Sequence, residues 1–377
     1  MSVISLGSLA RRAAAAPEQE PLPDSYFEAS PAELAERIGQ AKETLGSKLV
    51  VLGHHYQRDD IIRWADFIGD SFKLARYGAG RRDADFIVFC GVHFMAESAD
   101  ILAAEHQSVI LPNLTAGCSM ADMANIHQVE EAWEHLTRAS NRRIVPVTYM
   151  NSAANLKAFV GEHGGAVCTS SNARTILDWA FTQGEQVLFF PDQHLGRNTG
   201  LRMGIPLSEM AVWDPWALGG GEDPDNYRRS RILLWKGHCS VHARFTVGQI
   251  EEARRTHPGV RIVVHPECEN AVVEAADDYG STEKIVAVVN AARPGTTFGI
   301  GTEVNLVNRL AHEHPDKTIF CLDPVVCPCS TMYRIHPAYL LWVLDNLLDG
   351  RVKNRIIVPE RDKQWARAAL DRMLALG

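Results

Sequence analysis

Three cysteines that lie far apart in the sequence are the residues best suited to act together chemically. Cys118 lies in PNLTAGCSMAD, Cys239 lies in LLWKGHCSVHARF, and Cys329 ends the CPC motif that begins at Cys327. Each follows a strand-like apolar run and is surrounded by glycine, proline and polar residues. The C-x2-C pairs of zinc ribbons and thioredoxin-like redox sites do not occur. A shared site therefore requires the fold to gather one thiol from each of three segments.

Two kinds of metal centre fit three converging thiolates. One is zinc with three sulfur ligands and an open position, although catalytic zinc sites more often include histidine. The other is a 4Fe-4S cluster with three cysteine ligands, whose fourth iron keeps a free position for a substrate hydroxyl or carboxylate and acts as a Lewis acid. The alternative is that these cysteines are buried as small apolar residues, which is common. We expect that structural role for Cys90, Cys168, Cys268 and Cys321.

Short, continuously apolar runs alternate with helical patterns along the chain. Such runs predict parallel strands that helices cover on both faces, and hence a three-layer α/β architecture. The predicted strands span residues 48–53, 86–91, 108–113, 143–149, 166–169, 186–191, 231–235, 261–266 and 318–322.

Polar motifs follow the C-terminal ends of these predicted strands, at the edge where open α/β sheets bind ligands. For any single motif, a turn or a helix cap is the simpler explanation. Their common location favours a shared site. The motifs are GHHYQ, CGVHF, NLTAGC, TYMNS, TSSN, PDQH, GHC, HPE, GTE and CPC.

Three of these motifs place a hydroxyl residue at a predicted helix start, where free backbone N–H groups suit a phosphate or carboxylate. Ser71 precedes Cys118 by 47 residues, and Thr282 precedes Cys329 by the same 47. Ser170 precedes Cys239 by 69 residues, and the extra length contains a Gly-, Pro- and Trp-rich stretch. The spacing predicts a threefold internal repeat in which each unit provides one anion-binding helix start and one thiol.

The expected domain organisation follows from the repeat. Ser30 and Glu33 predict a helix N-terminus that ends a flexible tail, and Gly46 predicts the end of that helix. We expect a tail at 1–29, α/β domains at 30–125, 126–242 and 243–330, an inserted loop at 196–230, and C-terminal helices at 331–377 that pack back on the core.

Composition narrows the class of protein. The chain has 377 residues, a net charge of −8, 46% hydrophobic and 22% charged residues. It shows no basic stripe, so nucleic acid is excluded as the main partner, and no apolar run has the length of a membrane span. Eight cysteines without framework spacing in a long chain predict reduced thiols and a cytoplasmic location. The Ala-rich, Arg-containing N-terminus leaves an organellar transit peptide as a minor alternative.

From about Val50 to the C-terminus, the motifs resemble those of the quinolinate synthase family, in its longer variant with a CPC motif. The resemblance implies three α/β domains related by pseudo-threefold symmetry, with a 4Fe-4S cluster held by one cysteine from each at a central cavity. It also implies that iminoaspartate condenses with dihydroxyacetone phosphate to quinolinate, with loss of phosphate and water, in NAD biosynthesis. The motifs are GHHYQRDD, GDSFKLAR, FCGVHFMAESADIL, PNLTAGCSMAD, VTYMNSAANLKA, CTSSNA, FFPDQHLG, WKGHCSVHARF, HPEC, GSTEKI, GTEVNLVNRL and CPCSTM.

The resemblance also implies roles for individual residues. Cys118, Cys239 and Cys329 match the cluster ligands, and Cys327 competes for the third place. Tyr333 departs from the family's pattern, which has Asn there. The residues that match catalytic positions are His54, Tyr56 and Glu267. The residues that match substrate-binding positions are His54, Ser71, Tyr149, Met150, Asn151, Ser170, His265, Pro266, Glu267 and Thr282.

The chemistry of such a condensation requires positioned acids and bases, because protons must move on and off carbon, nitrogen and oxygen. Glu267 and Tyr56 are the candidates. Beside a dicarboxylate, Glu267 would have a raised pKa, or it would be an ordinary ion-pair partner. Two other classes stay open: an iron–sulfur redox sensor without catalysis, and a zinc-dependent sugar-phosphate aldolase or dehydratase. The lability of iminoaspartate suggests functional coupling to L-aspartate oxidase.

Overall fold

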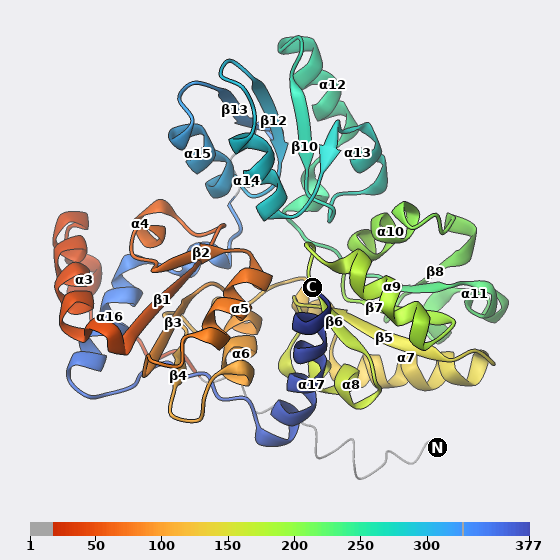
Figure 1. Cartoon of the computed structure of the whole chain (residues 1–377), viewed down its shortest axis with the longest axis horizontal. Helices are drawn as coiled ribbons and strands as arrows, with labels where there is room; N and C mark the ends of the chain where they lie inside the picture. The colour runs from red at the N-terminus through yellow and green to blue at the C-terminus, as the bar shows by residue number, and fades with distance from the viewer. Residues whose placement is uncertain (1–17, 326–327) are drawn as a thin grey trace.

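Three separate parallel sheets form three lobes around a common centre (Figure 1). The structure is a computed structural model that describes residues 18–325 and 328–377. In sheet order, the first lobe has strands β2 (Phe67–Gly69), β1 (Leu49–His54), β3 (Phe86–Cys90) and β4 (Ser108–Ile110). The second has β6 (Ala166–Cys168), β5 (Ile144–Tyr149), β7 (Gln186–Phe190), β9 (Ile232–Trp235) and β8 (Met210–Trp213). The third has β11 (Asp278–Tyr279), β10 (Arg261–Val264), β12 (Thr297–Gly301) and β13 (Thr318–Cys321).

The three sheets share one strand order. In each, the first strand along the chain lies between the second and the third, and a later strand extends the sheet; only the second sheet adds another strand, β8, at its edge. All strand pairs within the sheets are parallel, and β1, β4, β5, β6, β7 and β9 are buried along their whole length. The predicted three-layer α/β fold is therefore confirmed. The short strands β2, β8, β11 and β12 were not predicted.

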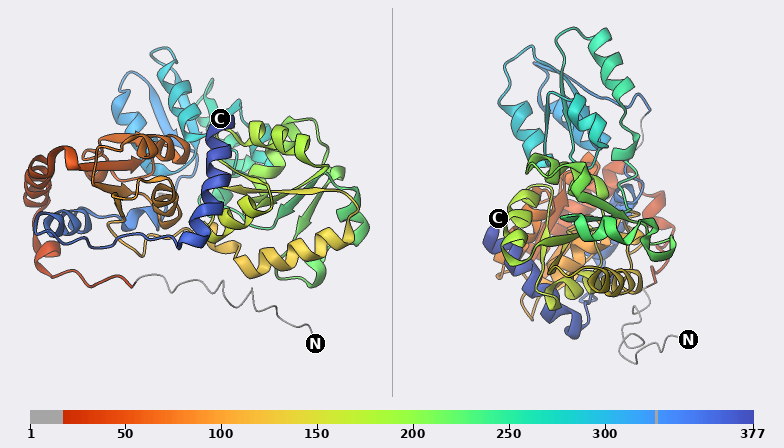
Figure 2. Two further views of the ribbon diagram at one scale, coloured as in Figure 1. Left: turned by 60° about the horizontal axis from the view of Figure 1, so that its bottom comes forward. Right: turned by 90° about the vertical axis from the view of Figure 1, so that its right-hand side faces the viewer.

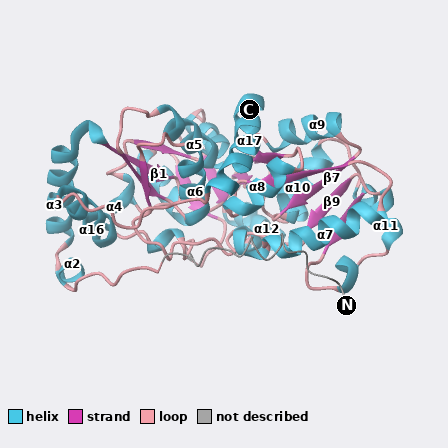
Figure 3. Ribbon diagram, turned by 90° about the horizontal axis from the view of Figure 1, so that it is seen from below, coloured by secondary structure: helices cyan, strands magenta, loops and turns pink. Residues whose placement is uncertain are grey.

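Helices cover the sheets and link the lobes (Figures 1 and 3). The first lobe contains α4 (Asp59–Ile62), α5 (Ser71–Gly80) and α6 (His93–Leu102). The second contains α7 (Ile126–Ala139), α8 (Ala154–Glu162), α9 (Ala173–Gln183), α10 (Gln193–Arg202) and α11 (Pro224–Arg229). The third contains α12 (Val247–Thr256), α13 (Asn270–Ala275), α14 (Thr282–Asn290) and α15 (Val304–Glu313). The terminal helices are α2 (Ser25–Glu28), α3 (Pro31–Leu45), α16 (Pro337–Leu348) and α17 (Glu360–Leu376).

The N-terminal segment is attached to the body of the protein. Residues 1–17 of the expected tail lie outside the described residues. Beyond them, the Gln19 side chain accepts a hydrogen bond from the Leu114 N–H, at 2.8 Å. Helix α3 begins where the sequence predicts, because the Ser30 hydroxyl accepts from the Glu33 N–H at 3.2 Å, and it ends at Gly46 with a positive φ of 52°.

The segment 196–230, expected to be an inserted loop, instead contains most of α10, the strand β8 and the helix α11. Its glycines read as loop signals in the sequence, but Gly196 and Gly200 lie inside α10. A Cβ at either position would collide with side chains of the sheet, including Phe189 and Ile232. These glycines therefore serve close helix–sheet packing, a requirement that only the tertiary structure reveals.

The C-terminal helices join the first two lobes. Helix α16 packs against α3, and α17 packs against α8, so the end of the chain stands between the first and second lobes (Figures 1 and 2). The buried apolar residues of these two lobes and of both helices form one continuous cluster. Those of the third lobe form two smaller clusters of their own. Among the described helices, none is both long and apolar enough to cross a membrane.

The contact between α8 and α17 predicts a stability effect. A Cβ at Gly161 would overlap the backbone carbonyl of Trp365, whereas one at Gly80 would meet nothing within 4 Å. We expect Gly161→Ala to lower the free energy of unfolding by about 1–3 kcal/mol, because backbone cannot yield as a flexible side chain does. Gly80→Ala, at the end of α5, should be neutral or slightly stabilising. Denaturant unfolding of both variants checks this, and equal midpoints would contradict it.

Candidate active site

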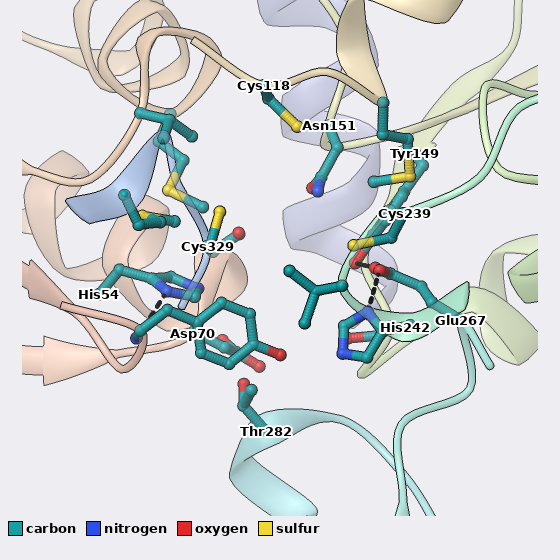
Figure 4. Close-up of a pocket in the computed structure, with 18 of the residues that line it drawn as sticks. His54, Asp70, Cys118, Tyr149, Asn151, Cys239, His242, Glu267, Thr282 and Cys329 are labelled. Atoms are coloured by element: carbon teal, nitrogen blue, oxygen red, sulfur yellow. Dashed lines mark hydrogen bonds and ion pairs between the residues drawn. The ribbon is translucent and has the colours of Figure 1, made fainter. Parts of the chain in front are cut away.

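One pocket lies where the three lobes meet, and all three sheets contribute to it (Figure 4). The empty space in it, counting the open mouth, is about 640 Å³. Met150 and Pro266 do not line it. Of the residues singled out from the sequence, the following line the pocket: His54, Tyr56, Ser71, Cys118, Tyr149, Asn151, Ser170, Cys239, His265, Glu267, Thr282 and Cys329.

The three cysteines enter this pocket from equivalent positions of the repeat. Each is followed by serine, then by a single 3₁₀ turn that begins three residues on, and then by a long helix that begins eight residues on. The helices are α7, α12 and α16, each of which belongs to a different lobe. Each cysteine therefore lies where the chain passes from one lobe to the next, and α16 returns it to the first. This crossing geometry is the reason that segments far apart in sequence meet at the centre.

The equivalence extends to hydrogen bonds. The carbonyl of each cysteine accepts from the N–H four residues on, at 3.1 Å for Cys118 and 2.9 Å for both Cys239 and Cys329. Cys327 lies outside the described residues. It is followed by proline rather than serine, so its sequence does not match the other two units.

Burial disfavours the thiolate form of a cysteine unless a positive charge lies nearby. It raises the pKa of Cys118 to about 12. It also raises the pKa of Cys239 well above its ordinary value, and the nearby Glu267 adds to that shift. Thiolates at this position would therefore need a metal to compensate them. The other described cysteines, Cys90, Cys168, Cys268 and Cys321, do not line this pocket.

A buried carboxylate lies beside Cys239 in the pocket. Oε1 of Glu267 accepts from the Tyr149 hydroxyl at 2.6 Å, and Oε2 lies 2.7 Å from Nδ1 of His242. The His265 ring stacks on His242, with centroids 4.3 Å apart. Burial by itself would raise the pKa of Glu267, but the two histidines and the hydrogen bonds outweigh it and lower the pKa to about 2. The expectation of a raised pKa is therefore wrong, and the ion-pair alternative is observed.

A chain of hydrogen bonds leads from this carboxylate to the opposite wall. Because an ionised carboxylate only accepts, Nδ1 of His242 carries a proton, and its Nε2 lies 3.1 Å from Oγ1 of Thr302. The same Oγ1 lies 2.8 Å from the Tyr56 hydroxyl. Tyr56, Thr302, His242 and Glu267 thus form a continuous path for protons through a site that solvent barely reaches.

Comparison with known proteins agrees with this arrangement. A family model described as quinolinate synthetase A protein (NadA) matches residues 36–375. The chain belongs to the quinolinate synthase family. It is 59% identical to the quinolinate synthase of Corynebacterium glutamicum, over 96% of this chain and 92% of that protein. It is 54% identical to that of Acidobacterium capsulatum, over 94% and 95% of the two chains. It is 55% identical to that of a Nocardioides species, over 92% and 90%.

Two members of the site were missed in the sequence analysis, although one had a detectable signal. His242 begins the 3₁₀ turn after Cys239, and the equivalent positions in the other repeats are Ala121 and Met332. A histidine at only one of these three equivalent positions is a departure from the repeat that the sequence alone could have shown. Thr302 gave no such signal, because its two partners come from different lobes.

Two further histidines of this quinolinate synthase family member are neutral donors or acceptors. Burial, followed by the charges of His55 and Arg309, lowers the pKa of His54 to about 3. Its Nδ1 accepts from the Tyr56 N–H at 3.1 Å, so its proton is on Nε2. Burial and then His242 lower the pKa of His265 to about 3. Neither ring therefore brings a positive charge to the pocket at neutral pH.

The three predicted anion-binding helix starts meet at the pocket, with one correction. The N-caps of α5, α9 and α14 are Asp70, Asn172 and Ser281 rather than the expected Ser71, Ser170 and Thr282. Ser71 and Thr282 instead open their helices, and Ser170 precedes α9; all three line the pocket. Tyr333 does not line it; the Arg58 guanidinium lies over its ring at 4.6 Å.

Polar contacts tie these helix starts together. The Ser171 hydroxyl donates to Asp70 at 2.5 Å, joining the first and second lobes. In the third lobe, Glu283 accepts from His55 Nε2 at 2.8 Å and from Lys73 Nζ at 2.5 Å, both of the first lobe. Burial opposes ionisation of Glu283, but these hydrogen bonds outweigh it and lower its pKa to about 2. Glu283 thus links lobes beside Thr282.

This link predicts a pH-dependent stability. The folded pKa of Glu283 lies below its ordinary 4.5, so its stabilisation is complete above pH 4.5 and is lost as pH falls toward 2. We expect Glu283→Gln to lower the free energy of unfolding at about pH 7 by about 1 kcal/mol or less, since the carboxylate is partly exposed and screened. The deficit should shrink by about pH 3. Glu43→Gln, on the exposed face of α3, is the control, and a deficit that does not change with pH would contradict the link.

Proposed function

We propose that this chain condenses iminoaspartate with dihydroxyacetone phosphate to quinolinate, with loss of phosphate and water, as a step of NAD biosynthesis. We also propose that its central pocket holds a 4Fe-4S cluster on Cys118, Cys239 and Cys329. Membership of the quinolinate synthase family gives the activity. The observation that carries the assignment of the site is the entry of three thiols, from equivalent turns of three repeats, into one pocket that also contains an acid–base chain.

The residues present fit a cluster with three protein ligands. Their thiols line one pocket, and burial disfavours the anions of Cys118 and Cys239 unless a metal is bound. Cys329 is favoured over Cys327 because it is followed by serine and by the turn that the other two units share, whereas Cys327 is followed by proline. When bound, such a cluster would supply a Lewis-acid iron with one position free of protein ligands.

The chain's own residues provide proton transfer and binding. Glu267, ionised at neutral pH, is the base that takes a proton from substrate carbon or nitrogen, and Tyr56 is the acid at the other end of the path through Thr302 and His242. His54 presents its Nε2–H as a neutral hydrogen-bond donor to a substrate oxygen. Asn151 is assigned to substrate binding because its buried Oδ1 has no partner among the described protein atoms.

The remaining walls position the anions and limit water. Ser71, Ser170 and Thr282 offer hydroxyls, and the helix starts beside them offer N–H groups, for one phosphate and two carboxylates. Apolar side chains such as Phe94, Val241 and Met332 cover the rest of the pocket and slow hydrolysis of the imine. Tyr149 and His265 complete the proposed substrate-binding set, and Met150 and Pro266, which do not line the pocket, are left out of it. The proposal includes a cytoplasmic location and functional coupling to L-aspartate oxidase, because iminoaspartate is labile.

One observation favours a second candidate, a zinc-dependent sugar-phosphate aldolase or dehydratase. The ligand atoms of Cys239, His242 and Glu267 lie within 4.8 Å of one another, and a thiolate, an imidazole and a carboxylate are zinc ligands. Metal analysis separates the two candidates. Iron with inorganic sulfide supports the cluster, and zinc without sulfide supports the alternative.

The deciding experiment is anaerobic purification followed by assay. Iron, sulfide and the absorption spectrum are measured first. Dihydroxyacetone phosphate and freshly generated iminoaspartate are then added, and quinolinate is quantified. We expect about four irons per chain and quinolinate formation. Protein with a full cluster that makes no quinolinate would refute the proposed reaction.

Cysteine variants test the ligand set. Cys118→Ala and Cys239→Ala should each lose the cluster and the activity, because a cluster held by two thiolates is not retained. Cys329→Ala should do the same, while Cys327→Ala should keep its iron. The measurements are iron content and the visible absorption of anaerobic protein. The assignment of the third ligand fails if only Cys327→Ala loses iron.

The acid–base chain gives a separate prediction. Glu267→Gln keeps the size of the side chain but removes the base, so we expect kcat to fall by about 10²- to 10⁴-fold while the iron content is unchanged. Glu269→Gln, two residues along the same loop, is the matched control. A redox sensor without catalysis would be indifferent to Glu267→Gln.

A further inference from the structure

A single buried amide connects the second lobe to the loop that carries Glu267. Asn198 lies in α10 and is 2% exposed. Its Nδ2 donates to the carbonyl of Pro266 and to the carbonyl of Cys268, both at 2.9 Å. These are the two carbonyls that flank Glu267 in the chain. The side chain of Asn198 therefore holds the backbone on both sides of the catalytic carboxylate.

The orientation of this amide is fixed by its surroundings. If the Asn198 amide were turned over, its Oδ1 would face two carbonyl oxygens, which cannot donate. In the observed orientation, Oδ1 is buried and has no partner among the described atoms. A buried acceptor without a partner lowers the free energy of unfolding. The two hydrogen bonds made by Nδ2 offset that loss.

The position of Asn198 is set by the second sheet. Helix α10 packs closely on that sheet through Gly196 and Gly200, which leave no space for a Cβ. The same sheet carries Tyr149 at the end of β5, and Tyr149 donates to Glu267 at 2.6 Å. Asn198 and Tyr149 thus contact the Glu267 segment from one rigid body, one through the backbone and the other through the side chain.

This contact crosses a boundary that has little apolar support. The buried apolar residues of the third lobe form clusters separate from the one that spans the first two lobes. Within its own lobe, the loop is held by the bond from His265 N–H to the Gly301 carbonyl, at 3.0 Å. That bond fixes the start of the loop but not its position relative to Tyr149. Polar contacts across the boundary must therefore set the position of the Glu267 loop relative to the second lobe.

We propose that Asn198 is a positioning residue that places Glu267 against Tyr149 and His242, and that turnover depends on its two hydrogen bonds. The inference deepens the proposed function and rests on it. Without these two hydrogen bonds, Glu267 can move by up to about an ångström relative to Tyr149 and His242. Misplacement on that scale lowers the rate by up to about 100-fold. Substrate anions bind elsewhere, at the helix starts, so their binding should change little.

The test compares Asn198→Ala and Asn198→Asp with the control Arg202→Ala. Arg202 lies one turn along the same face of α10 and crosses the same boundary, with its guanidinium 3.9 Å from the centre of the Tyr279 ring, but it does not touch the Glu267 loop. The anaerobic holoenzymes are measured for iron content, for kcat, and for the KM of dihydroxyacetone phosphate. We expect Asn198→Ala to lower kcat by about 10- to 100-fold with full iron and a KM within about twofold. Asn198→Asp should lose more, because its carboxylate faces two carbonyl oxygens.

The control should stay within about twofold of the parent chain in kcat and KM. A kcat of Asn198→Ala within about twofold of the parent, or a loss no greater than that of Arg202→Ala, would overturn the proposal. If Asn198→Ala loses its iron, Asn198→Ser is used instead, since its shorter side chain leaves a hydroxyl in the buried site but cannot make both hydrogen bonds. An iron-replete serine variant with unchanged kcat would also overturn it. Absence of quinolinate from the parent enzyme would instead refute the proposed function itself.

Discussion

Three thiols share one pocket, and each is carried on the crossing between two lobes of the protein. This constraint determines most of the architecture. A site built from one residue per repeat exists only while all three lobes keep their relative positions. The first two lobes achieve this with a continuous apolar core that α16 and α17 complete. The third lobe relies on individual polar contacts, among them those of Glu283 and Asn198.

Electrostatics in the pocket follow from burial. Burial disfavours charge on the thiols of Cys118 and Cys239 and on the ring of His54. Glu267 is the exception, because a phenol and an imidazole donate to its two oxygens and compensate the loss of water. The result is an ionised base beside a histidine ring and two thiols whose charged forms burial disfavours. In such surroundings, a bound metal or an anionic substrate experiences little screening.

The three repeated units are alike in backbone, and the side chains that differ between them supply the proposed acid–base chemistry. The three Cys-Ser turns are alike in backbone and in the helix that follows. Their side chains differ, since the turn position that holds Ala121 and Met332 in two repeats holds His242 in the other. A symmetric scaffold can therefore bring equivalent thiols together while one unit supplies the acid–base group. The second sheet departs further, with the added strand β8 between α10 and α11.

The sequence alone determined the α/β class, the parallel strands, the repeated cysteines and the membership of most pocket residues. These features depend on local signals: continuous apolar runs, polar residues at strand ends, and spacing. It did not reveal that 196–230 is mostly ordered, because glycines that allow close packing resemble glycines that form loops. It also did not reveal the low pKa of Glu267 or the partners of Thr302 and Asn198. Those properties arise from contacts between lobes, and the tertiary structure alone decides them because the residues involved are remote in the chain.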